Sequence, residues 1–246
     1  MPPDLIALYT ATMSLMYSVI FPAYNEASSI ERAICETELV FEALQEPFEV
    51  IVVDDGSRDE TVAIVQRMMR IFGNIQLVKQ EKNRGKGMAV KRGVAVARGA
   101  YILFLDCDLA THPSEVRAFI PDIQNRSADI VIGSRRAKGT NIVLAQPWYR
   151  VAFGRLFNIS IRWYLNIPYK DTQCGFKLFT REAAQAVFTD LVTSGWAFDV
   201  EILVRARRAG LRIMEKPVTW CNGRESRVRL ADAWKIMSEL HRIKRL

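Results

Sequence analysis

The chain has few residues of the kinds that build disulfide frameworks or zinc sites. It contains four cysteines and two histidines in 246 residues, and no cysteines stand in Cys-x-x-Cys spacing. Secreted mini-domains need closely spaced cysteine pairs, and structural zinc sites need clustered Cys and His ligands. The sequence therefore argues against both classes and favours a reducing compartment.

Long apolar runs and repeats are also missing. No stretch approaches the ~20 apolar residues that a membrane-spanning helix needs. Residues 1–16 are mildly apolar but lack the basic start of a signal peptide, so we treat them as an N-terminal extension. No repeat, low-complexity segment or linker divides the rest, and the length suits one large domain. We expect a single domain over residues 1–246.

The charge balance favours an anionic partner. The net charge is +7 and the pI is near 9.4, which suits nucleic acid, acidic lipid or a phosphorylated substrate. No RNP, zinc-finger or helix-turn-helix signature is present. Acidic residues at the expected strand ends would repel a phosphate backbone unless metal intervened. We expect no nucleic-acid partner, although charge alone keeps a basic nucleic-acid-binding module as an alternative.

Short apolar runs alternate with helix-like segments, which predicts an α/β fold with a doubly wound, mostly parallel sheet and flanking helices. Capping-box spacing at residues 28–31 and 57–60 marks two helix starts, and Gly99 is placed to end the helix that follows Gly87. The expected strands are residues 17–23, 48–53, 75–79, 101–105 and 129–133.

One strand carries the central chemical signal. The apolar run Tyr101–Leu105 reads as a buried strand and ends in Asp106 and Asp108. Carboxyl ends of parallel strands line the ligand crevice of an open α/β sheet. Two carboxylates there suit Mg²⁺ or Mn²⁺, which bind through one or two carboxylates plus substrate phosphates. The alternative is a strand followed by an ordinary acidic turn.

Other strand ends support a nucleotide site. Asp54 and Asp55 are placed to accept hydrogen bonds from a base or ribose. Gly85 and Gly87 would let backbone N–H groups approach phosphates at a helix N-terminus, and Lys86 adds charge. There is no Walker A pattern, and the third glycine of a dinucleotide fingerprint is missing, so an ordinary flexible turn is the alternative. With the carboxylates, the glycines favour a nucleotide diphosphate held by metal.

Three motifs together resemble family-2 inverting glycosyltransferases with the GT-A fold: residues 21–26 (Phe-Pro-Ala-Tyr-Asn-Glu), residues 53–57 (Val-Asp-Asp-Gly-Ser) and the Asp106-Cys107-Asp108 triplet. Further segments look like the dolichyl-phosphate β-glucosyltransferases and their prokaryotic polyprenyl-phosphate relatives. These segments are residues 83–87, 133–135, 171–179 and 196–201. The similarity runs from about residue 17 to the C-terminus.

The resemblance implies roles for individual residues. The nucleotide pocket would comprise Pro22, Tyr24, Glu26, Asp54, Asp55, Gly85, Lys86 and Asp106. The metal ligands would be Asp106 and Asp108, and the acceptor phosphate would meet Ser134, Arg135 and Arg150. The catalytic set would be Asp106, Asp108, Arg135, Gln173 and Asp199, with Glu201 as an alternative to Asp199 near the donor sugar and acceptor. Leu109 stands where relatives often carry a small or polar residue, which puts any metal contact from that position in doubt.

The implied reaction moves a hexose from a nucleotide sugar, with UDP-glucose favoured, to a polyprenyl or dolichyl phosphate. A phosphate monoester has a second pKa near ~6, so the acceptor is already a dianionic nucleophile at neutral pH. Single displacement with inversion then needs stabilisation of the leaving diphosphate and placement of the acceptor. The alternatives are a GDP-mannose-dependent enzyme like dolichyl-phosphate mannose synthase, a UDP-N-acetylhexosamine donor, or a soluble GT-A transferase with a carbohydrate or protein acceptor.

Two C-terminal amphipathic segments raise the question of membrane contact. Residues 147–165 interleave aromatic residues with arginines, which suits a helix lying among lipid headgroups. Residues 230–246 carry an apolar face with flanking basic residues. The alternative is that both helices pack on the sheet, and for the second we favour packing. We therefore expect a cytoplasmic protein that is peripheral on the cytoplasmic face of the membrane.

Overall fold

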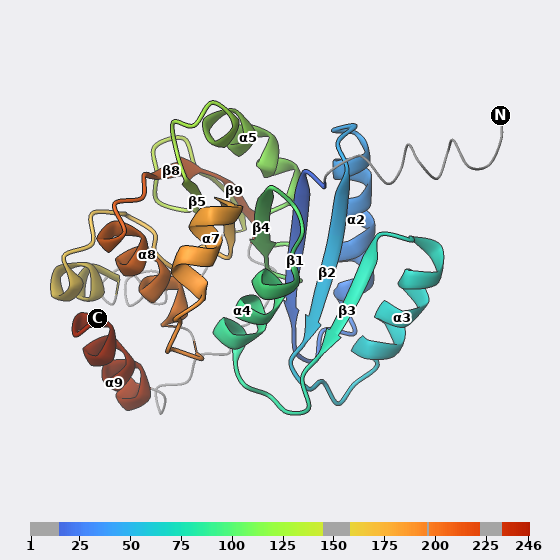
Figure 1. The fold of residues 1–246 in the computed structure, drawn as a ribbon, viewed down its shortest axis with the longest axis horizontal. Coiled ribbons are helices and arrows are strands. Elements are labelled where there is room, and N and C mark those ends of the chain that lie inside the picture. The colour runs from blue at the N-terminus through green and yellow to red at the C-terminus, as the bar shows by residue number, and fades with distance from the viewer. Residues whose placement is uncertain (1–14, 145–157, 196, 222–232) are drawn as a thin grey trace.

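The structure is a computed structural model that describes residues 15–144, 158–195, 197–221 and 233–246. Its centre is a seven-stranded sheet of order β3-β2-β1-β4-β7-β5-β8 (Figure 1). Strand β7 is antiparallel to its neighbours β4 and β5, and the other neighbouring pairs are parallel. The strands are β1 (Tyr17–Ala23), β2 (Phe48–Asp54), β3 (Ile75–Lys79), β4 (Tyr101–Leu105), β5 (Ile130–Ser134), β7 (Phe176–Thr180) and β8 (Ile213–Pro217).

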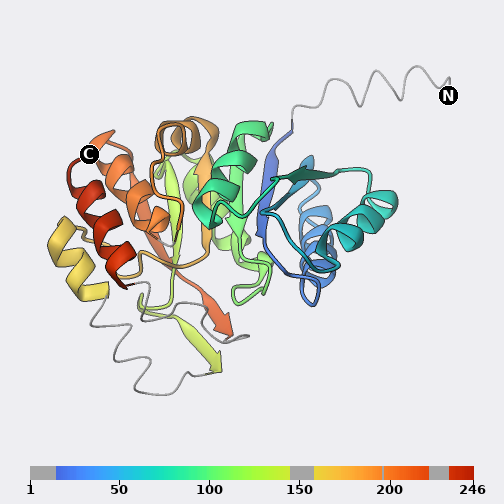
Figure 2. The same cartoon turned by 90° about the horizontal axis from the view of Figure 1, so that it is seen from below.

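Helices cover both faces of this sheet, as a doubly wound fold requires (Figure 2). Val19 and Phe21 of β1 pack in one core with α2 (Ile30–Glu42), α3 (Thr61–Ile71) and α5 (Val116–Gln124). Ile20 points to the other core, with α4 (Lys86–Val96), α7 (Arg181–Phe188) and α8 (Phe198–Arg208). This alternation explains why the strands read as continuous apolar runs. The predicted mostly parallel α/β fold is confirmed.

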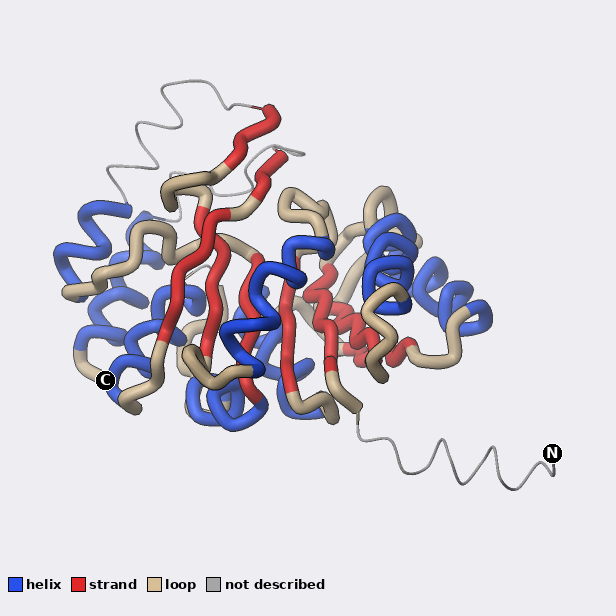
Figure 3. The backbone as a smooth tube through the Cα atoms, turned by 90° about the horizontal axis from the view of Figure 1, so that it is seen from above, coloured by secondary structure: helices blue, strands red, loops and turns tan. Residues whose placement is uncertain are grey.

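A small second sheet extends the carboxyl edge. Strands β6 (Asn141–Leu144) and β9 (Thr219–Cys221) pair in parallel beyond the ends of β5 and β8 (Figure 3). A single 3-10 turn, η1 (Pro113–Glu115), precedes α5. Four strands, β6, β7, β8 and β9, were not predicted from the sequence: β6 and β9 are short, β8 is half-exposed, and Lys177 interrupts the apolar run of β7.

The predicted capping boxes are wrong. Helix α2 begins after Ser29, and α3 begins at Thr61, and neither N-cap residue makes a side-chain capping bond. Ser57 Oγ instead accepts the Asn25 N–H at 2.9 Å, which joins the exit loops of β1 and β2. Ser57 therefore connects two loops rather than capping a helix.

Gly99 does not end α4, which stops at Val96. Its N–H donates to Ser18 Oγ at 2.7 Å, and a Cβ at this position would lie 2.4 Å from the Ser18 backbone nitrogen. The buried Glu49 carboxylate also accepts from Ser18 and from Arg98. Close backbone approach at the amino edge of the sheet, rather than helix termination, therefore explains the glycine.

The C-terminal helix α9 (Ala233–Lys244) packs on the domain. Leu240 and Ile243 are buried in a cluster with Ile161, Val200 and Val204. The packing interpretation of residues 230–246 is confirmed for these side chains. Of the other predicted segment, residues 158–165 are helical and residues 147–157 lie outside the described part of the chain. Within the described residues, no helix has the length and apolar character to cross a bilayer.

The buried carboxyl of Glu38 should make the stability of the fold depend on pH. This residue on α2 is 3% exposed. Its Oε2 accepts a hydrogen bond from Asn74, whereas its Oε1 has no hydrogen-bond partner within the described structure. Burial raises the pKa of the Glu38 carboxyl to about 7. Below its unfolded pKa, near 4.5, the Glu38 carboxyl is protonated in both the folded and the unfolded protein. The cost of ionising it in the folded protein therefore appears only as the pH rises above that value. Relative to Glu38→Gln, the wild-type unfolding free energy should fall by roughly 3 kcal/mol between pH 4 and pH 8.

Urea titrations across that range measure this difference. Glu81→Gln, at an exposed loop carboxyl, is the matched control. Parallel pH profiles for wild type and Glu38→Gln would contradict the prediction.

Candidate functional site

The site forms at the carboxyl ends of β1, β2 and β4, in the middle of the sheet. Asp106 follows β4, and its Oδ1 lies 2.6 Å from Nζ of Lys86, the first residue of α4. The Lys86 ammonium also lies 5.9 Å from the Phe104 ring centroid and 5.7 Å from that of Phe198. Burial lowers the pKa of Lys86, but the nearby carboxylates, Asp106 first, outweigh it and raise that pKa. Lys86 is thus a half-buried cation held by the first acid of the pair.

Asp108 is held by a tight bend. Leu109 adopts a left-handed backbone with φ of 52°, and its side chain is buried in the core. The Ala110 N–H donates to Asp108 Oδ1 at 3.0 Å. Burial, followed by the charge of Asp106, raises the pKa of Asp108. The bend fixes the second carboxylate near the first, where additional positive charge would be stabilising.

These two acids fit a divalent cation shared with a ligand. Among the described residues, no group of three His, Cys, Asp or Glu side chains is arranged to hold a metal. Mg²⁺ and Mn²⁺ sites that bind substrate phosphates use one or two carboxylates and take the remaining oxygens from phosphate and water. Asp106 and Asp108 match that donor set, and buried Leu109 adds no ligand.

Hydrogen bonds join the exit loops of β1 and β2. Glu26 N–H in the β1 exit loop donates at 2.8 Å to Oγ1 of Thr61, the first residue of α3, and within the β2 exit loop Asp54 Oδ1 accepts the Ser57 N–H at 3.1 Å. Asn25, in the left-handed region, accepts through Oδ1 from the Arg58 N–H. The loops therefore form one rim. The predicted pocket residues Pro22, Tyr24 and Glu26 lie on the β1 side of this rim, and Asp54 and Asp55 lie on the β2 side.

Asp55 has a structural role that sequence reasoning missed. Its buried carboxylate accepts the Arg84 N–H at 2.7 Å, the Gly85 N–H at 2.8 Å and Gln80 Nε2 at 3.1 Å. Burial raises its pKa, and the two amide hydrogen bonds oppose that rise. The carboxylate therefore holds the turn of residues 83–87 against β2, and these bonds occupy oxygens predicted to meet a base or ribose.

The two glycines of that turn also differ from expectation. The Gly87 N–H donates to the Ser194 carbonyl at 3.0 Å, and the Gly85 N–H donates to Asp55. At Gly85, whose φ is 96°, a Cβ would lie 2.3 Å from the Ser194 oxygen. Both amides thus bind protein acceptors instead of the predicted phosphates, because the turn packs closely against the loop around Ser194.

Arg135 is already paired. Its Nε and Nη2 donate to the buried Asp171 carboxylate at 2.7 and 2.8 Å, and its guanidinium lies 5.7 Å from the Trp220 ring centroid. Although burial alone would raise the pKa of Asp171, hydrogen bonds and charge from Arg135 lower it to about 2. Ser134 is fully buried, and the Gln173 N–H donates to Asp171 at 3.3 Å. The predicted acceptor residue Arg150 lies outside the described residues.

Asp199 and Glu201, in the first turn of α8, are buried anchors. Asp199 is ion-paired with fully buried Lys177, whose Nζ also donates to the Cys174 carbonyl at 2.6 Å. Glu201 accepts the N–H groups of Val192 and Thr193. The structure thus places Asp199 behind the site rather than open to a substrate. Sequence reasoning missed Lys177 because a charged residue inside an apolar run gives no sign of its partner.

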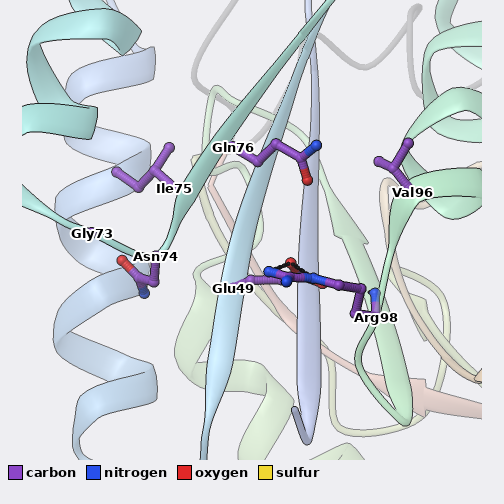
Figure 4. A pocket seen from close by; sticks show the side chains of 7 residues that line it. All are labelled: Glu49, Gly73, Asn74, Ile75, Gln76, Val96 and Arg98. Atoms are coloured by element: carbon purple, nitrogen blue, oxygen red, sulfur yellow. Dashed lines mark hydrogen bonds and ion pairs between the residues drawn. The ribbon is translucent and has the colours of Figure 1, made fainter. Parts of the chain in front are cut away.

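A separate cavity of about 340 Å³ lies at the amino edge of the sheet, at the starts of β2 and β3 (Figure 4). Glu49 and Arg98 pair across it. None of its lining residues belongs to the predicted site. They are Glu49, Gly73, Asn74, Ile75, Gln76, Val96 and Arg98.

Comparison with known proteins identifies the class. A mostly parallel sheet with an acid pair at its carboxyl edge is the arrangement expected of a GT-A glycosyltransferase. The family model described as Glycosyl transferase family 2 matches residues 18–188, which include both acids and Lys86. The chain belongs to glycosyl transferase family 2.

The most informative relatives share one activity in their names. The chain is 36% identical over 229 residues to a dolichyl-phosphate beta-glucosyltransferase of Dictyostelium discoideum, covering 89% of this chain and 70% of that protein. It is 33% identical over 244 residues to the Saccharomyces cerevisiae protein of the same name, covering 92% and 73%.

A solved structure supports the fold. Glucosyl-3-phosphoglycerate synthase from Mycobacterium tuberculosis, in complex with Mn²⁺, UDP and glucosyl-3-phosphoglycerate, superposes with a TM-score of 0.68 at 20% identity. The comparison covers 100% of this chain and 86% of that one. At this identity the likeness establishes a shared GT-A fold.

The hydrogen bonds of the Asp55 carboxylate should protect the backbone amides of Arg84 and Gly85 from exchange with solvent. Asp55→Asn keeps the shape but replaces one acceptor oxygen by an amide donor facing the N–H of Arg84 or Gly85. Backbone amide exchange at these residues should accelerate by about 10-fold or more, since a hydrogen bond to a buried charge contributes about 1.5–3 kcal/mol. Hydrogen-exchange mass spectrometry measures it, with Asp190→Asn at an exposed carboxyl as control. Unchanged protection of residues 84–85 would show that Asp55 does not hold the turn.

Proposed function

We propose that this chain transfers glucose from UDP-glucose to dolichyl phosphate or a related polyprenyl phosphate, with Mg²⁺ or Mn²⁺ as cofactor. The observation that carries the proposal is the cluster of Asp106, Asp108 and Lys86 at the carboxyl edge of the sheet. It lies in a family-2 chain whose relatives are named for glucose transfer to dolichyl phosphate.

The donor side of the site uses charge. Asp106 and Asp108 would hold the divalent ion, which when bound neutralises a diphosphate leaving group. Lys86 stands 2.6 Å from Asp106, so its ammonium is placed to meet the same diphosphate. The rim formed by the exit loops of β1 and β2, with Tyr24, Glu26 and Asp54, is the proposed boundary of the nucleoside site. The UDP held by the mycobacterial synthase, which shares this fold, favours a uridine nucleotide.

The acceptor side needs positive charge and orientation but no strong base. A lipid phosphate is largely dianionic at neutral pH, since its second pKa is about 6. We assign Arg135, Ser134, Gln173 and Arg150 to its surroundings. Asp171 fixes Arg135 in one orientation, which pre-organises its charge for phosphate. Because Asp199 is buried against Lys177, we assign it a positioning role acting through that lysine.

Contact with a membrane surface is the second part of the proposal. Trp163 is 86% exposed and Ile159 is 56% exposed, one helical turn apart in residues 158–165. Exposed tryptophan beside basic residues is typical of interfacial helices. The lipid acceptor makes such contact useful, because its phosphate lies at the headgroup level. We place the enzyme as a peripheral protein on the cytoplasmic face.

A transfer assay tests the reaction. Purified protein with Mn²⁺, labelled UDP-glucose and dolichyl phosphate should yield a labelled lipid product. Asp108→Asn should reduce kcat/KM by roughly 100-fold or more, since charge stabilisation by a bound ion contributes several kcal/mol. Asp190→Asn, at an exposed position, should keep full activity.

The same transfer assay is repeated with GDP-mannose and with UDP-N-acetylglucosamine as the sugar donor. A clear preference for GDP-mannose would replace the donor with that of the mannose synthase alternative. Transfer to sugar or protein acceptors but not to dolichyl phosphate would support a soluble transferase. No transfer from any nucleotide sugar would overturn the proposal.

Vesicle flotation tests the membrane contact. Vesicles of neutral and anionic phospholipid at low salt should carry the protein upward, and Trp163→Ala should reduce the bound fraction severalfold. The control, Leu39→Ala, removes another exposed apolar side chain on α2, on the other side of the molecule (Figure 1). Equal flotation of Trp163→Ala and wild type, or no flotation at all, would remove the proposed contact.

A further inference from the structure

Gly175 lies directly across from the first acid of the pair. It immediately precedes β7, and the antiparallel register pairs Phe176 with Leu105, so the next opposed pair is Gly175 and Asp106. The Asp106 N–H donates to the Gly175 carbonyl at 3.2 Å. This backbone contact fixes the position of the Asp106 main chain but does not by itself set the χ1 angle of its side chain.

The Asp106 carboxylate occupies the space that a side chain at position 175 would take. A Cβ on Gly175 would lie 2.0 Å from Asp106 Oδ2, 2.5 Å from its Cγ and 3.0 Å from its Oδ1. Lys86 Nζ lies 2.6 Å from Oδ1. The carboxylate is thus confined between the Cα of Gly175 and the Lys86 ammonium.

Backbone conformation does not require a glycine here. The glycines with positive φ are Gly56, Gly85, Gly139 and Gly210 among the described residues, and Gly175 is not one of them. Alanine is therefore compatible with the local backbone. The nearest atoms to the added Cβ belong to the end of one side chain. Space for the Asp106 carboxylate is the remaining reason for the glycine.

Gly99 shows the contrasting case. There the added Cβ would meet backbone atoms of Tyr17 and Ser18 at 2.4–2.5 Å, so the strand itself would have to move. At Gly175 the backbone can stay while the carboxylate rotates away. Substitution at Gly175 should therefore change the site more than the fold.

We propose that Gly175 is a positioning residue that sets the side-chain orientation of Asp106, and so its contact with Lys86 and with the bound divalent ion. The inference rests on the proposed function insofar as Asp106 is taken to hold that ion. Gly175 touches neither substrate nor metal, and it acts by leaving room for the carboxylate.

The test compares Gly175→Ala with wild type by Mn²⁺ binding in the presence of UDP, followed by electron paramagnetic resonance. Gly175→Ala should weaken Mn²⁺ binding by about 10-fold or more, the range typical of residues that orient a metal ligand. In the transfer assay, Gly175→Ala should lower kcat, and this change should be larger than any change in KM for dolichyl phosphate. Gly73→Ala, where nothing lies within 4 Å of the added Cβ, is the matched control and should behave as wild type.

A double-mutant cycle keeps the test decisive if Gly175→Ala lowers stability. Asp106→Ala removes the atoms that the new Cβ meets, so adding Gly175→Ala to it should cost nothing further in unfolding free energy. Equal destabilisation by Gly175→Ala in both backgrounds would mean a backbone role and would overturn the inference.

The outcomes separate this inference from the proposed function. If wild type with UDP binds no Mn²⁺, the proposed metal role of Asp106 fails. If wild type binds Mn²⁺ and Asp106→Ala does not, while Gly175→Ala binds as wild type does, only the positioning role fails.

Discussion

The organisation of the site depends on the need to balance two carboxylates at the buried end of β4. Asp106 and Asp108 follow a strand whose last four residues are buried, and the charge of Asp106 makes Asp108 harder to ionise. Lys86 supplies the nearby positive charge, but it comes from the first turn of α4, a position that is unfavourable for a cation because of the helix dipole. The fold must therefore hold that helix end in place.

Two sets of contacts do so. Asp55 binds the amides of Arg84 and Gly85 from the β2 side. From the other side, Glu201 of α8 binds the amides of Val192 and Thr193, and the next residue in that loop accepts the Gly87 N–H. Asp55 and Glu201, which the sequence offered as candidates for the nucleotide pocket and for the sugar and acceptor site, thus serve as anchors for the loops around Lys86. Such anchors are costly to bury unless fully hydrogen-bonded, which they are.

Sequence reasoning located the five early strands to within one residue and placed the acid pair at the correct sheet edge, because uninterrupted apolar runs followed by Asp are local signals. It did not predict the insertion of β7 between β4 and β5, since pairing between distant strands leaves no periodic trace. It also did not identify the protein partners of Arg135, Asp199 and Gly85, which are Asp171, Lys177 and Asp55. Those partners lie 22 to 36 residues away in sequence, and only the fold brings them together.

The most direct measurement is a crystal structure of the protein with UDP-glucose and Mn²⁺, with the metal located by anomalous scattering. We expect a single manganese peak at coordination distance, about 2.0–2.2 Å, from Asp106 or Asp108 and from diphosphate oxygens. A manganese or diphosphate bound elsewhere, with Asp106 still contacting Lys86 alone, would contradict it.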